Sequence, residues 1–527
     1  SGTTMTYNDV YKDDHILNVF GGMELNGTDR SRSWFNGVGM QYDMGMLSNY
    51  DYRYFKQGNE ENTAYYTVSR TKSREVSFFG TATYSYQGKY TINGTMRYEG
   101  SNKLGRSRSA RWLPTWNVSG AWNMHEESFF ESLRPSLSNF TLKASYSLTA
   151  DRGPVNVTNS LAVIMGYNPW RPLSSVNESG LQITDLENSE LTYEKKHELN
   201  IGAEVGFLEN RINLAVDWYK RNNYDLIGLI NTMGVGGQVS KLANVASMES
   251  HGVEFTLSTR NISTKNFKWT TDFIFSNAKN KVTELKSDAN VMSMISGSGF
   301  ALEGNPVRSL YSLNFQGLNK EGLPTFINEK GELTVTDINF QERENKSHLV
   351  YEGSTDPTIT GSFGNIFSYK GFKLNVFMTY SFGNVIRLDP VFHNAYSDLD
   401  ATPREFKNRW TVAGDEKITT VPVIADLRQN TMNSYLNKAY NAYNYSTERI
   451  AKGDFIRMKE ISVTYEFPKT MVSKLSLSNL SLKIQGTNLF LLYADKKLNG
   501  QDPEFFNSGG VAVPVPKQFT LTLRLGI

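Results

Sequence analysis

Hydrophobic and polar residues alternate with a period of two in many separate segments of about ten residues. The pattern is clearest in 140–148, 199–207, 212–218, 371–383 and 519–527. A period of two places every second side chain on the same face of a β-strand. Each segment therefore predicts a strand with one apolar and one polar face. The length and repetition of the segments are typical of a transmembrane β-barrel.

The connections between these segments alternate between short and long. Tight turns are predicted at 86–89, 208–211 and 369–371, each with Gly or Asn suited to a hairpin. Long loops are predicted near 41–74, 150–195, 225–248, 384–454 and 491–517. A soluble β-sandwich also alternates, but compact soluble domains rarely carry repeated long loops. Outer-membrane barrels combine short periplasmic turns with long extracellular loops, so a barrel is favoured.

Counting strands from the C-terminus gives about 17 strands, with the short turns in the periplasm. This count needs two strands between about 280 and 356, and the candidates are Val307–Gln316 and Leu323–Asn328. The first strand is predicted at His15–Asn26, running toward the periplasm. Seventeen is odd, whereas bacterial barrels close with an even number of strands. We therefore expect residues 1–527 to be the C-terminal part of a larger barrel.

Composition restricts the function further. The chain has 55 basic and 53 acidic residues, a net charge of +2, which provides no electrostatic basis for binding nucleic acid. It has no cysteine, which excludes disulfides, thiolate zinc sites and cysteine nucleophiles. Aromatic residues make up 13% of the chain, which fits the aromatic girdles of a barrel in a lipid bilayer.

Short motifs over most of the chain resemble the SusC/RagA family of TonB-dependent outer-membrane transporters. They include Arg97–Asn102, Arg111–Trp122, Leu191–Glu194, Trp218–Arg221, Arg457–Ser462, Gln485–Phe490, Asp502–Glu504 and Pro516–Thr520. The resemblance implies an all-β barrel of about 22 strands with an N-terminal plug in its lumen. No plug domain is recognised within this chain. The resemblance also implies a SusD-like lipoprotein lid, energy from the TonB complex and import of oligosaccharides or peptides.

Aromatic residues in the predicted loops are the candidate substrate-binding residues. Aromatic rings stack on sugars or on peptide side chains, and tyrosine adds a hydroxyl group. The candidates are Tyr52, Tyr54, Tyr167, Trp170, Tyr443 and Tyr445. The alternative role is packing within the loops or contact with the lid. A further polar set is expected to face the lumen, where lysine and glutamate can pair: Lys143, Glu204, Asp217, Lys373, Lys483 and Arg524.

Motifs for catalysis or cofactor binding are incomplete. His125–Glu127 lacks the second histidine of a zinc-protease motif, and Gly234–Gly237 lacks the spacing of a dinucleotide loop. The adjacent Glu60 and Glu61 point apart in an extended loop, so they make a poor glycosidase pair. We therefore predict no enzyme activity, cofactor or metal. The alternatives to active import are a passive porin-like channel and a surface glycan-binding or adhesin β-protein.

Overall fold

The computed structural model describes most of the chain. The described residues are 1–35, 52–61, 66–134, 136–153, 162–167, 180–234, 240–285, 289–296, 299–397, 399, 402–475, 477–506 and 516–526. Trp170 and parts of the predicted loops at 41–74, 150–195 and 491–517 lie outside these residues. None of the described helices is long and apolar enough to cross a lipid bilayer.

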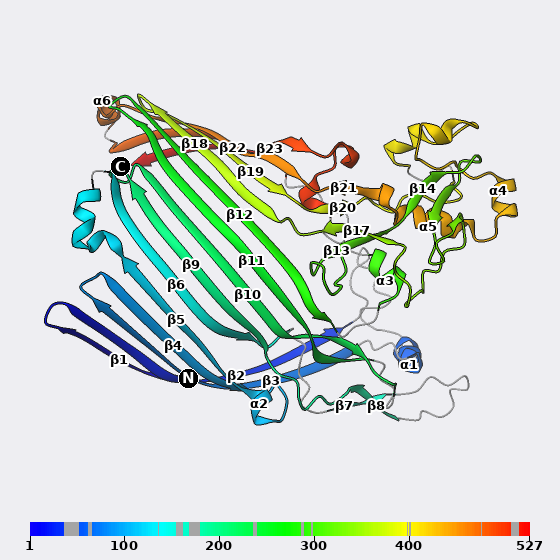
Figure 1. Ribbon diagram of the computed structural model, residues 1–527, viewed down its shortest axis with the longest axis horizontal. Helices are drawn as coiled ribbons and strands as arrows, with labels where there is room; N and C mark the ends of the chain where they lie inside the picture. Colours follow the sequence, from blue (N-terminus) through cyan, green and yellow to red (C-terminus); the bar gives the residue numbers. More distant parts are fainter. Residues whose placement is uncertain are drawn as a thin grey trace.

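Among the described residues, fifteen strands form one curved antiparallel sheet, in which neighbours along the chain are paired (Figure 1). In sheet order these are β1 (Gly2–Tyr11), β2 (His15–Phe35), β3 (Tyr66–Tyr86), β4 (Tyr90–Ser101), β5 (Trp112–Asn123), β6 (Leu137–Asp151), β9 (Glu194–Phe207), β10 (Ile212–Asn231), β11 (Ser240–Ser263), β12 (Phe267–Leu285), β18 (Ile359–Tyr369), β19 (Phe372–Phe382), β22 (Phe455–Glu466), β23 (Asn479–Ala494) and β24 (Gln518–Gly526). The predicted β-barrel architecture is confirmed as a large antiparallel sheet, and β1 and β24 are its two edges.

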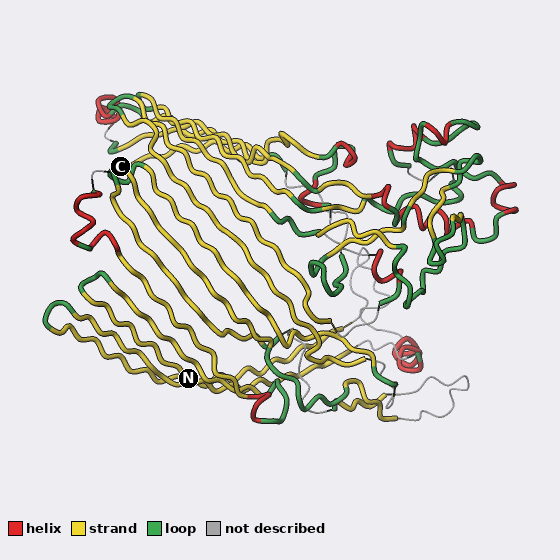
Figure 2. The backbone as a smooth tube through the Cα atoms, in the orientation of Figure 1, coloured by secondary structure: helices red, strands yellow, loops and turns green. Residues whose placement is uncertain are grey.

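The connections lie at two ends of the sheet. We call one the turn end, because it carries short turns such as 12–14, 87–89, 208–211 and 370–371. The other is the loop end, with the long connections. Among the turn residues, Leu208, Glu209 and Asn210 all have positive φ, which lets the chain reverse tightly between β9 and β10. Figure 2 shows the strands running between these two ends.

The register confirms that the sheet has one polar and one apolar face. Across β19, β22, β23 and β24, one row of paired residues is Lys373, Thr464, Lys483 and Thr522. The adjacent row, on the opposite face, is Leu374, Val463, Ile484 and Leu521. Val463, Ile484 and Leu521 are 42%, 58% and 70% exposed, so the described residues of the chain leave this apolar face uncovered. An exposed apolar face spanning neighbouring strands matches contact with lipid, and the polar face then lines the lumen.

Tryptophans lie on the outward, apolar face near both ends of the sheet. Trp112 stacks on Tyr98 toward the loop end, with ring centroids 5.1 Å apart. Trp122 stacks on Tyr90 at the turn end, with centroids 6.2 Å apart. Two aromatic bands on either side of an apolar belt correspond to the interfacial girdles of a membrane barrel.

The predicted strand count was too high in one region. The expected strands Val307–Gln316 and Leu323–Asn328 are not in the large sheet, because β12 pairs directly with β18. Their residues form β13 (Ser309–Leu313), β14 (Phe315–Leu318) and β15 (Pro324–Ile327), which pair with β17 (Leu349–Ser354) and β16 (Leu333–Thr334) in two small sheets. These strands are too short to cross a bilayer, which needs about 9–11 residues.

Two further predictions about the strands need correction. The predicted first strand His15–Asn26 lies within β2, which follows β1 and runs toward the loop end instead of the turn end. The stretch 225–248, expected as a loop, is mostly strand, since β10 continues to Asn231 and β11 begins at Ser240. Apolar residues stand at consecutive positions in this stretch, as in Leu226–Ile227 and Leu229–Ile230, so it shows no alternation with a period of two.

Two long insertions at the loop end fold together into one body, which we call the loop domain (described residues of 289–358 and 383–454). Besides β13–β17 it contains α3 (Val291–Ile295), β20 (Val385–Arg387), α4 (Leu427–Met432), α5 (Leu436–Asn444) and β21 (Ile450–Lys452). Both insertions supply its hydrophobic core, including Ile295, Leu313 and Phe326 from the first and Phe392 and Tyr440 from the second. The loop domain extends beyond the loop end of the sheet (Figure 1).

The remaining α-helices among the described residues are short and lie at the two ends. They are α1 (Tyr52–Glu60) and α2 (Arg108–Arg111) at the loop end and α6 (Lys469–Val472) at the turn end. The small hairpin of β7 (Val163–Tyr167) and β8 (Gly180–Asp185) also lies at the loop end.

We predict that Val216→Arg destabilises the folded protein in a bilayer, whereas Ala215→Arg is tolerated. Val216 pairs with Ala203 and Phe255 on the apolar face, and Ala215 pairs with Glu204 and Thr256 on the polar face. Arginine facing lipid near mid-depth costs about 2–4 kcal/mol. Urea unfolding in lipid vesicles measures this difference, and equal losses in the two variants would contradict the assignment of the faces.

Candidate functional site

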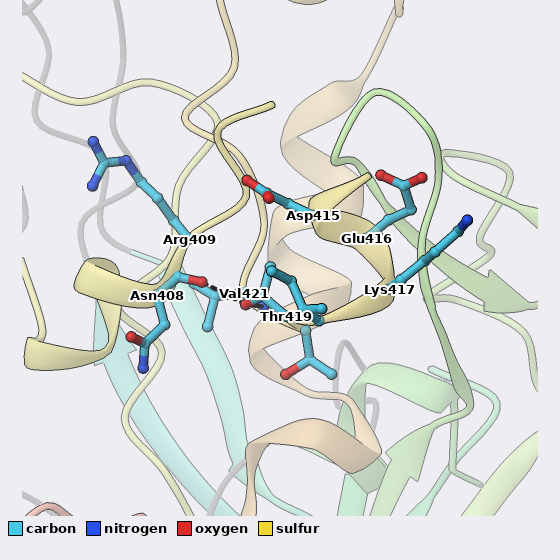
Figure 3. Close-up of a pocket in the computed structure, with 9 residues that line it drawn as sticks. Asn408, Arg409, Asp415, Glu416, Lys417, Thr419 and Val421 are labelled. Atoms are coloured by element: carbon cyan, nitrogen blue, oxygen red, sulfur yellow. Dashed lines mark hydrogen bonds between the residues drawn. The ribbon is translucent and has the colours of Figure 1, made fainter. Parts of the chain in front are cut away.

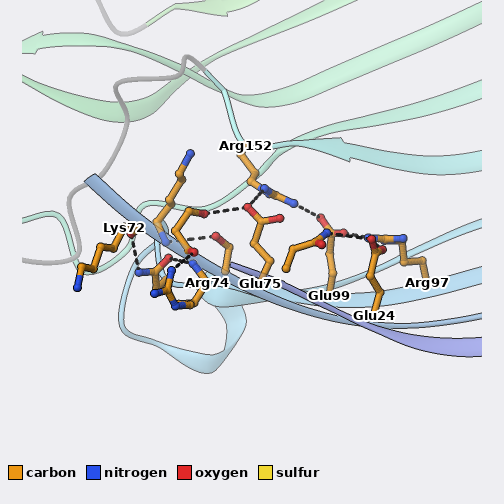
Figure 4. A network of polar contacts seen from close by, with 12 residues as sticks. Glu24, Lys72, Arg74, Glu75, Arg97, Glu99 and Arg152 are labelled. Atoms are coloured by element: carbon orange, nitrogen blue, oxygen red, sulfur yellow. Dashed lines mark hydrogen bonds and ion pairs between the residues drawn. The ribbon is translucent and has the colours of Figure 1, made fainter. Parts of the chain in front are cut away.

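Charged side chains join four elements on the polar face of the sheet toward the loop end (Figure 4). Arg97 on β4 binds Glu99 with 2.7 Å between Nε and Oε2, and its Nη2 lies 3.4 Å from Glu24 Oε2 on β2. Arg152, just after β6, contacts Glu75 on β3, and its Nη2 lies 3.7 Å from Glu99 Oε1. Three carboxylates thus surround two guanidinium groups. We call these five residues the wall network.

The wall network is partly shielded from solvent, since the side chains of Glu99 and Glu75 are 16% and 21% exposed. Ion pairs at this depth are stronger than those on an open surface, because less water screens them. The network therefore attaches the segment after β6 to the wall formed by β2–β4. Sequence reasoning missed it because its residues are far apart in the chain and only the strand register brings them together.

Two further charge clusters lie on the same polar face. Lys143 on β6 pairs with Glu204 on β9, as expected for lysine and glutamate facing a lumen. Glu198 on β9 binds Arg221 at 3.1 Å and Lys196 at 2.9 Å. The lumenal wall is therefore polar and largely charge-paired in this region, which suits a surface in contact with water, solutes or a polar protein partner.

A buried arginine joins the two insertions of the loop domain. Arg387 on β20 is 9% exposed, and its Nη2 donates to the carbonyl of Tyr311 at 2.5 Å and to the hydroxyl of Ser312 at 3.1 Å. Burial lowers the pKa of Arg387 to about 10, opposed by the nearby Glu352 carboxylate. Burial also raises the pKa of Glu352. The hydrogen bonds of Arg387 to Tyr311 and Ser312 therefore connect the second insertion to the first at a buried position.

A tight turn provides a second connection between the insertions. Gly322 has φ of +77°, and a Cβ there would lie 2.5 Å from the ring of Trp410. The amide of Val423 donates to the carbonyl of Gly322 at 3.0 Å. Only glycine fits this close approach without a shift of the tryptophan. The region 319–322 therefore serves packing between the insertions.

The loop domain carries a polar cavity of about 610 Å³ beside Trp410 (Figure 3). Its lining includes the basic Arg409 and Lys417, the acidic Asp415 and Glu416, and Thr419. Asp415 accepts hydrogen bonds from the amides of Thr411 and Val412, and these bonds hold its pKa below the usual value. The cavity offers hydrogen bonds to a polar ligand, but no aromatic ring lines it.

The structure does not gather the predicted aromatic residues into one site. Tyr52 lies in α1 and is 72% exposed, Tyr54 is in the same helix, and Tyr167 ends β7. Tyr443 and Tyr445 lie in and directly after α5, in the loop domain, apart from α1 and β7 (Figure 1). Trp170 lies outside the described residues.

Tyr443 packs inside the loop domain, which is the role expected of these aromatic residues if they do not bind substrate. It is 1% exposed, and its ring meets those of Phe315 and Phe392 edge-on, with centroids 5.5 and 5.0 Å away. Tyr445 is partly buried, with the Arg387 guanidinium 5.7 Å from its ring. Among the predicted aromatics with described side chains, Tyr52 alone presents an exposed ring. Within the described residues, no group of His, Asp and Glu is arranged to hold a metal ion.

Comparison with known proteins identifies the family of the chain. The family described as TonB dependent receptor-like, beta-barrel matches residues 1–389. The chain belongs to this family. Its members are outer-membrane transporters and not enzymes, so the predicted location and the absence of enzyme activity are confirmed.

Individual relatives confirm the resemblance to SusC. TonB-dependent receptor P39 of Formosa agariphila is 25% identical over 99% of this chain and 52% of its own length. TonB-dependent receptor P3 of the same organism is 26% identical over 81% of this chain and 42% of its own length. TonB-dependent receptor SusC of Bacteroides thetaiotaomicron is 23% identical over 89% of this chain and 44% of its own length. The chain spans about half the length of these curated relatives.

A solved structure supports the fold. The structure of the RagAB peptide transporter superposes with a TM-score of 0.77 at 21% identity, over 100% of this chain and 55% of the other. The fifteen strands and the loop domain together therefore have the fold of this known structure.

We predict that Arg387→Ala loosens the first insertion of the loop domain. Each hydrogen bond from a charged group contributes about 1.5–3 kcal/mol, so loss of two should lower the free energy of unfolding by about 3 kcal/mol or more. Hydrogen exchange of the β13 amides should accelerate. The control is Lys330→Ala, which removes an ion pair to Asp337 between two side chains more than half exposed and should leave exchange unchanged. Equal effects would contradict the role of Arg387.

We also predict that acid destabilises the loop domain through His348. This side chain is 6% exposed, and burial lowers its pKa, opposed by the carboxylates of Glu329 and Glu342. Burial disfavours the protonated imidazole in the folded state. The loop domain therefore keeps its full stability above about pH 6.5, the pKa of a histidine in the unfolded chain. Below that pH its free energy of unfolding falls by up to about 1.4 kcal/mol per pH unit. Hydrogen exchange of β17 between pH 8 and 5 measures this loss. His348→Gln should flatten the profile, and an unchanged profile would exclude this histidine.

Proposed function

We propose that this chain forms the wall of an energy-dependent outer-membrane importer for oligosaccharides or peptides. The observation that carries the proposal is the two-faced sheet with a large loop domain over one end, in a chain that belongs to the TonB-dependent receptor family. The outward face suits lipid, and the lumenal face suits a polar path. No step requires covalent chemistry.

We propose further that the fifteen strands are part of a larger closed barrel. Within the part of the chain that the structure describes, the edges β1 and β24 each leave a row of backbone groups without a strand partner. Such groups are costly in a bilayer, where water cannot pair with them. Additional strands of the same receptor, of about 22 in all, would close the barrel. A plug domain from the rest of the receptor would fill the lumen.

Partners follow from the same proposal. A SusD-like surface lipoprotein would cover the loop end, where the loop domain offers a broad surface, and the TonB complex would supply energy from the periplasmic side. The relatives named SusC and RagAB support this arrangement. The substrate would bind between the lipoprotein and the loops, where the exposed Tyr52 and the cavity beside Trp410 are the candidate contacts.

We predict that cells carrying the complete receptor take up labelled oligosaccharides or peptides only while the inner membrane is energised. Uptake of both ligand panels is measured with and without a proton uncoupler, and in a strain without TonB. Loss of uptake under both conditions is expected. Uptake that persists in both would instead establish a passive pore, and surface binding without any uptake would establish an adhesin.

A further inference from the structure

Basic side chains lie on the outward face of the sheet, directly beyond its apolar belt on the side of the loop end. Lys220 on β10 pairs with His251 on β11, and His251 pairs with Lys279 on β12, so the three lie in one row. Lys281 lies on the same face of β12, two residues closer to the loop end. All four residues are exposed. We call the three lysines the outward lysine patch.

Apolar surface extends up to the patch. Trp218 and Val253 are paired on the outward face, one row closer to the turn end, and are 37% and 36% exposed. Period two places Lys220 on the same face as Trp218. Leu199 on β9 pairs with Lys220 and so continues its row with an apolar side chain. The patch therefore borders the apolar belt on two sides.

The depth of the patch corresponds to the border of the bilayer. A transmembrane β-strand needs about 9–11 residues to cross the membrane. Because β10 begins at Ile212 at the turn end, Lys220 is its ninth residue. A lysine at this depth extends its amino group out of the apolar layer and into the layer of lipid headgroups. The patch thus lies at the level of the lipid phosphates.

The chain does not neutralise the patch. Glu249, which pairs with Lys281, is the one acidic residue where the two rows of the patch cross β9–β12, so two positive charges are in excess. Among the described residues, no carboxylate forms an ion pair with any of the three lysines. This distinguishes the patch from the wall network, where carboxylates surround the arginines.

The spacing of the three lysines suits a single anionic group. Lys220 and Lys279 are two strand spacings apart, about 10 Å, and Lys281 lies about 7 Å from Lys279 along β12. Lysine carries its charge on a flexible four-carbon stem, so the three amino groups can converge on one phosphate. His251, between Lys220 and Lys279, adds a ring nitrogen that can donate a hydrogen bond.

From this arrangement we propose that the outward lysine patch binds the phosphate group of a lipid in the leaflet next to the loop end. The amino groups donate charge-assisted hydrogen bonds to the phosphate oxygens, and the acyl chains of the same lipid lie against Trp218 and Val253. The proposal goes beyond transport. It requires only that the outward face lies in the outer membrane, and it involves no plug, energy source or imported substrate.

A lipid fits the patch better than a protein partner. The apolar surface beside the lysines requires an occupant that combines an anionic group with apolar chains, as a phosphate-bearing lipid does. A water-soluble acidic protein would match the charge but not the apolar border. A second copy of this chain, placed symmetrically on the patch, would bring lysine against lysine, and like charges repel.

Lipid binding to the complete receptor, purified in detergent and stripped of bound lipid, tests the proposal. The probe is lipid A, a glycolipid that carries phosphate groups, and the comparison is phosphatidylcholine, whose choline neutralises its phosphate. Native mass spectrometry measures the affinity for each lipid. We expect lipid A to bind at least tenfold more tightly, and its affinity to fall as the concentration of ammonium acetate rises. Equal affinities would overturn the proposal, because they would indicate binding through the acyl chains alone.

Substitution of the three lysines tests the position of the site. Lys220→Ser, Lys279→Ser and Lys281→Ser together should weaken binding of lipid A by about tenfold, equivalent to about 1.4 kcal/mol of binding free energy. Substitution of the same three lysines by arginine keeps their charge and should retain the affinity. Unchanged binding in the serine variant would overturn the proposal, as would an equal loss in the arginine variant.

The matched control makes the same change of net charge away from the membrane. Lys320→Ser, Lys330→Ser and Lys407→Ser remove three exposed lysines of the loop domain and should leave the affinity for lipid A unchanged. A tenfold loss in this control would show that the overall charge of the receptor, and not the patch, attracts the lipid.

Competition with inorganic phosphate separates a lipid site from a site for free phosphate. Inorganic phosphate lacks acyl chains, so it should displace lipid A only when present in large excess. Displacement at equal concentrations would assign the patch to free phosphate and overturn the proposal of a lipid.

Discussion

The structure depends on one constraint: inside a lipid bilayer, where there is no water, every backbone amide and carbonyl must be hydrogen-bonded within the protein. A bilayer allows only structures that satisfy these groups internally, and the chain meets the demand with long antiparallel strands joined in sequence order. Once strands cross the membrane, period two separates the side chains into a lipid face and a lumenal face. The apolar row through Leu374 and the polar row through Lys373 are direct results of this separation.

The same constraint explains why the polar chemistry lies where it does. Charged groups are costly where the outward face meets lipid, and many lie on the lumenal face instead, in the wall network, the pair of Lys143 and Glu204 and the basic residues Lys373, Lys483 and Arg524. The loop domain is free of this limitation because it extends beyond the sheet. It is built like a soluble domain, with a hydrophobic core and a buried arginine that joins two insertions.

Alternation along the chain predicted most of the membrane strands, since each carries its own two-faced pattern, but it missed β1 and the loop-end parts of β10 and β11. It was insufficient for the segment from 289 to 358, where short apolar runs such as Ser309–Leu313 have the same local pattern but pair within the loop domain. The choice depends on contacts with distant parts of the chain, since Ser309–Leu313 pairs with Leu349–Ser354 and Tyr311 accepts a hydrogen bond from Arg387. Tyr443 could have been recognised as a core residue, because Leu436, Ala439, Tyr440 and Tyr443 follow helical spacing and all are buried in α5. The wall network left no local signal.

Accessibility of single cysteines along β10 tests most directly whether this sheet is the wall of a membrane barrel. The chain contains no native cysteine, so each introduced one reports a single position. Spin labels from 213 to 218 would be examined in vesicles with lipid-soluble oxygen and a water-soluble nickel complex. The account predicts that oxygen reaches positions 214, 216 and 218, and that the other three positions are shielded from it. Equal accessibility of all six positions to the nickel complex would contradict a membrane wall.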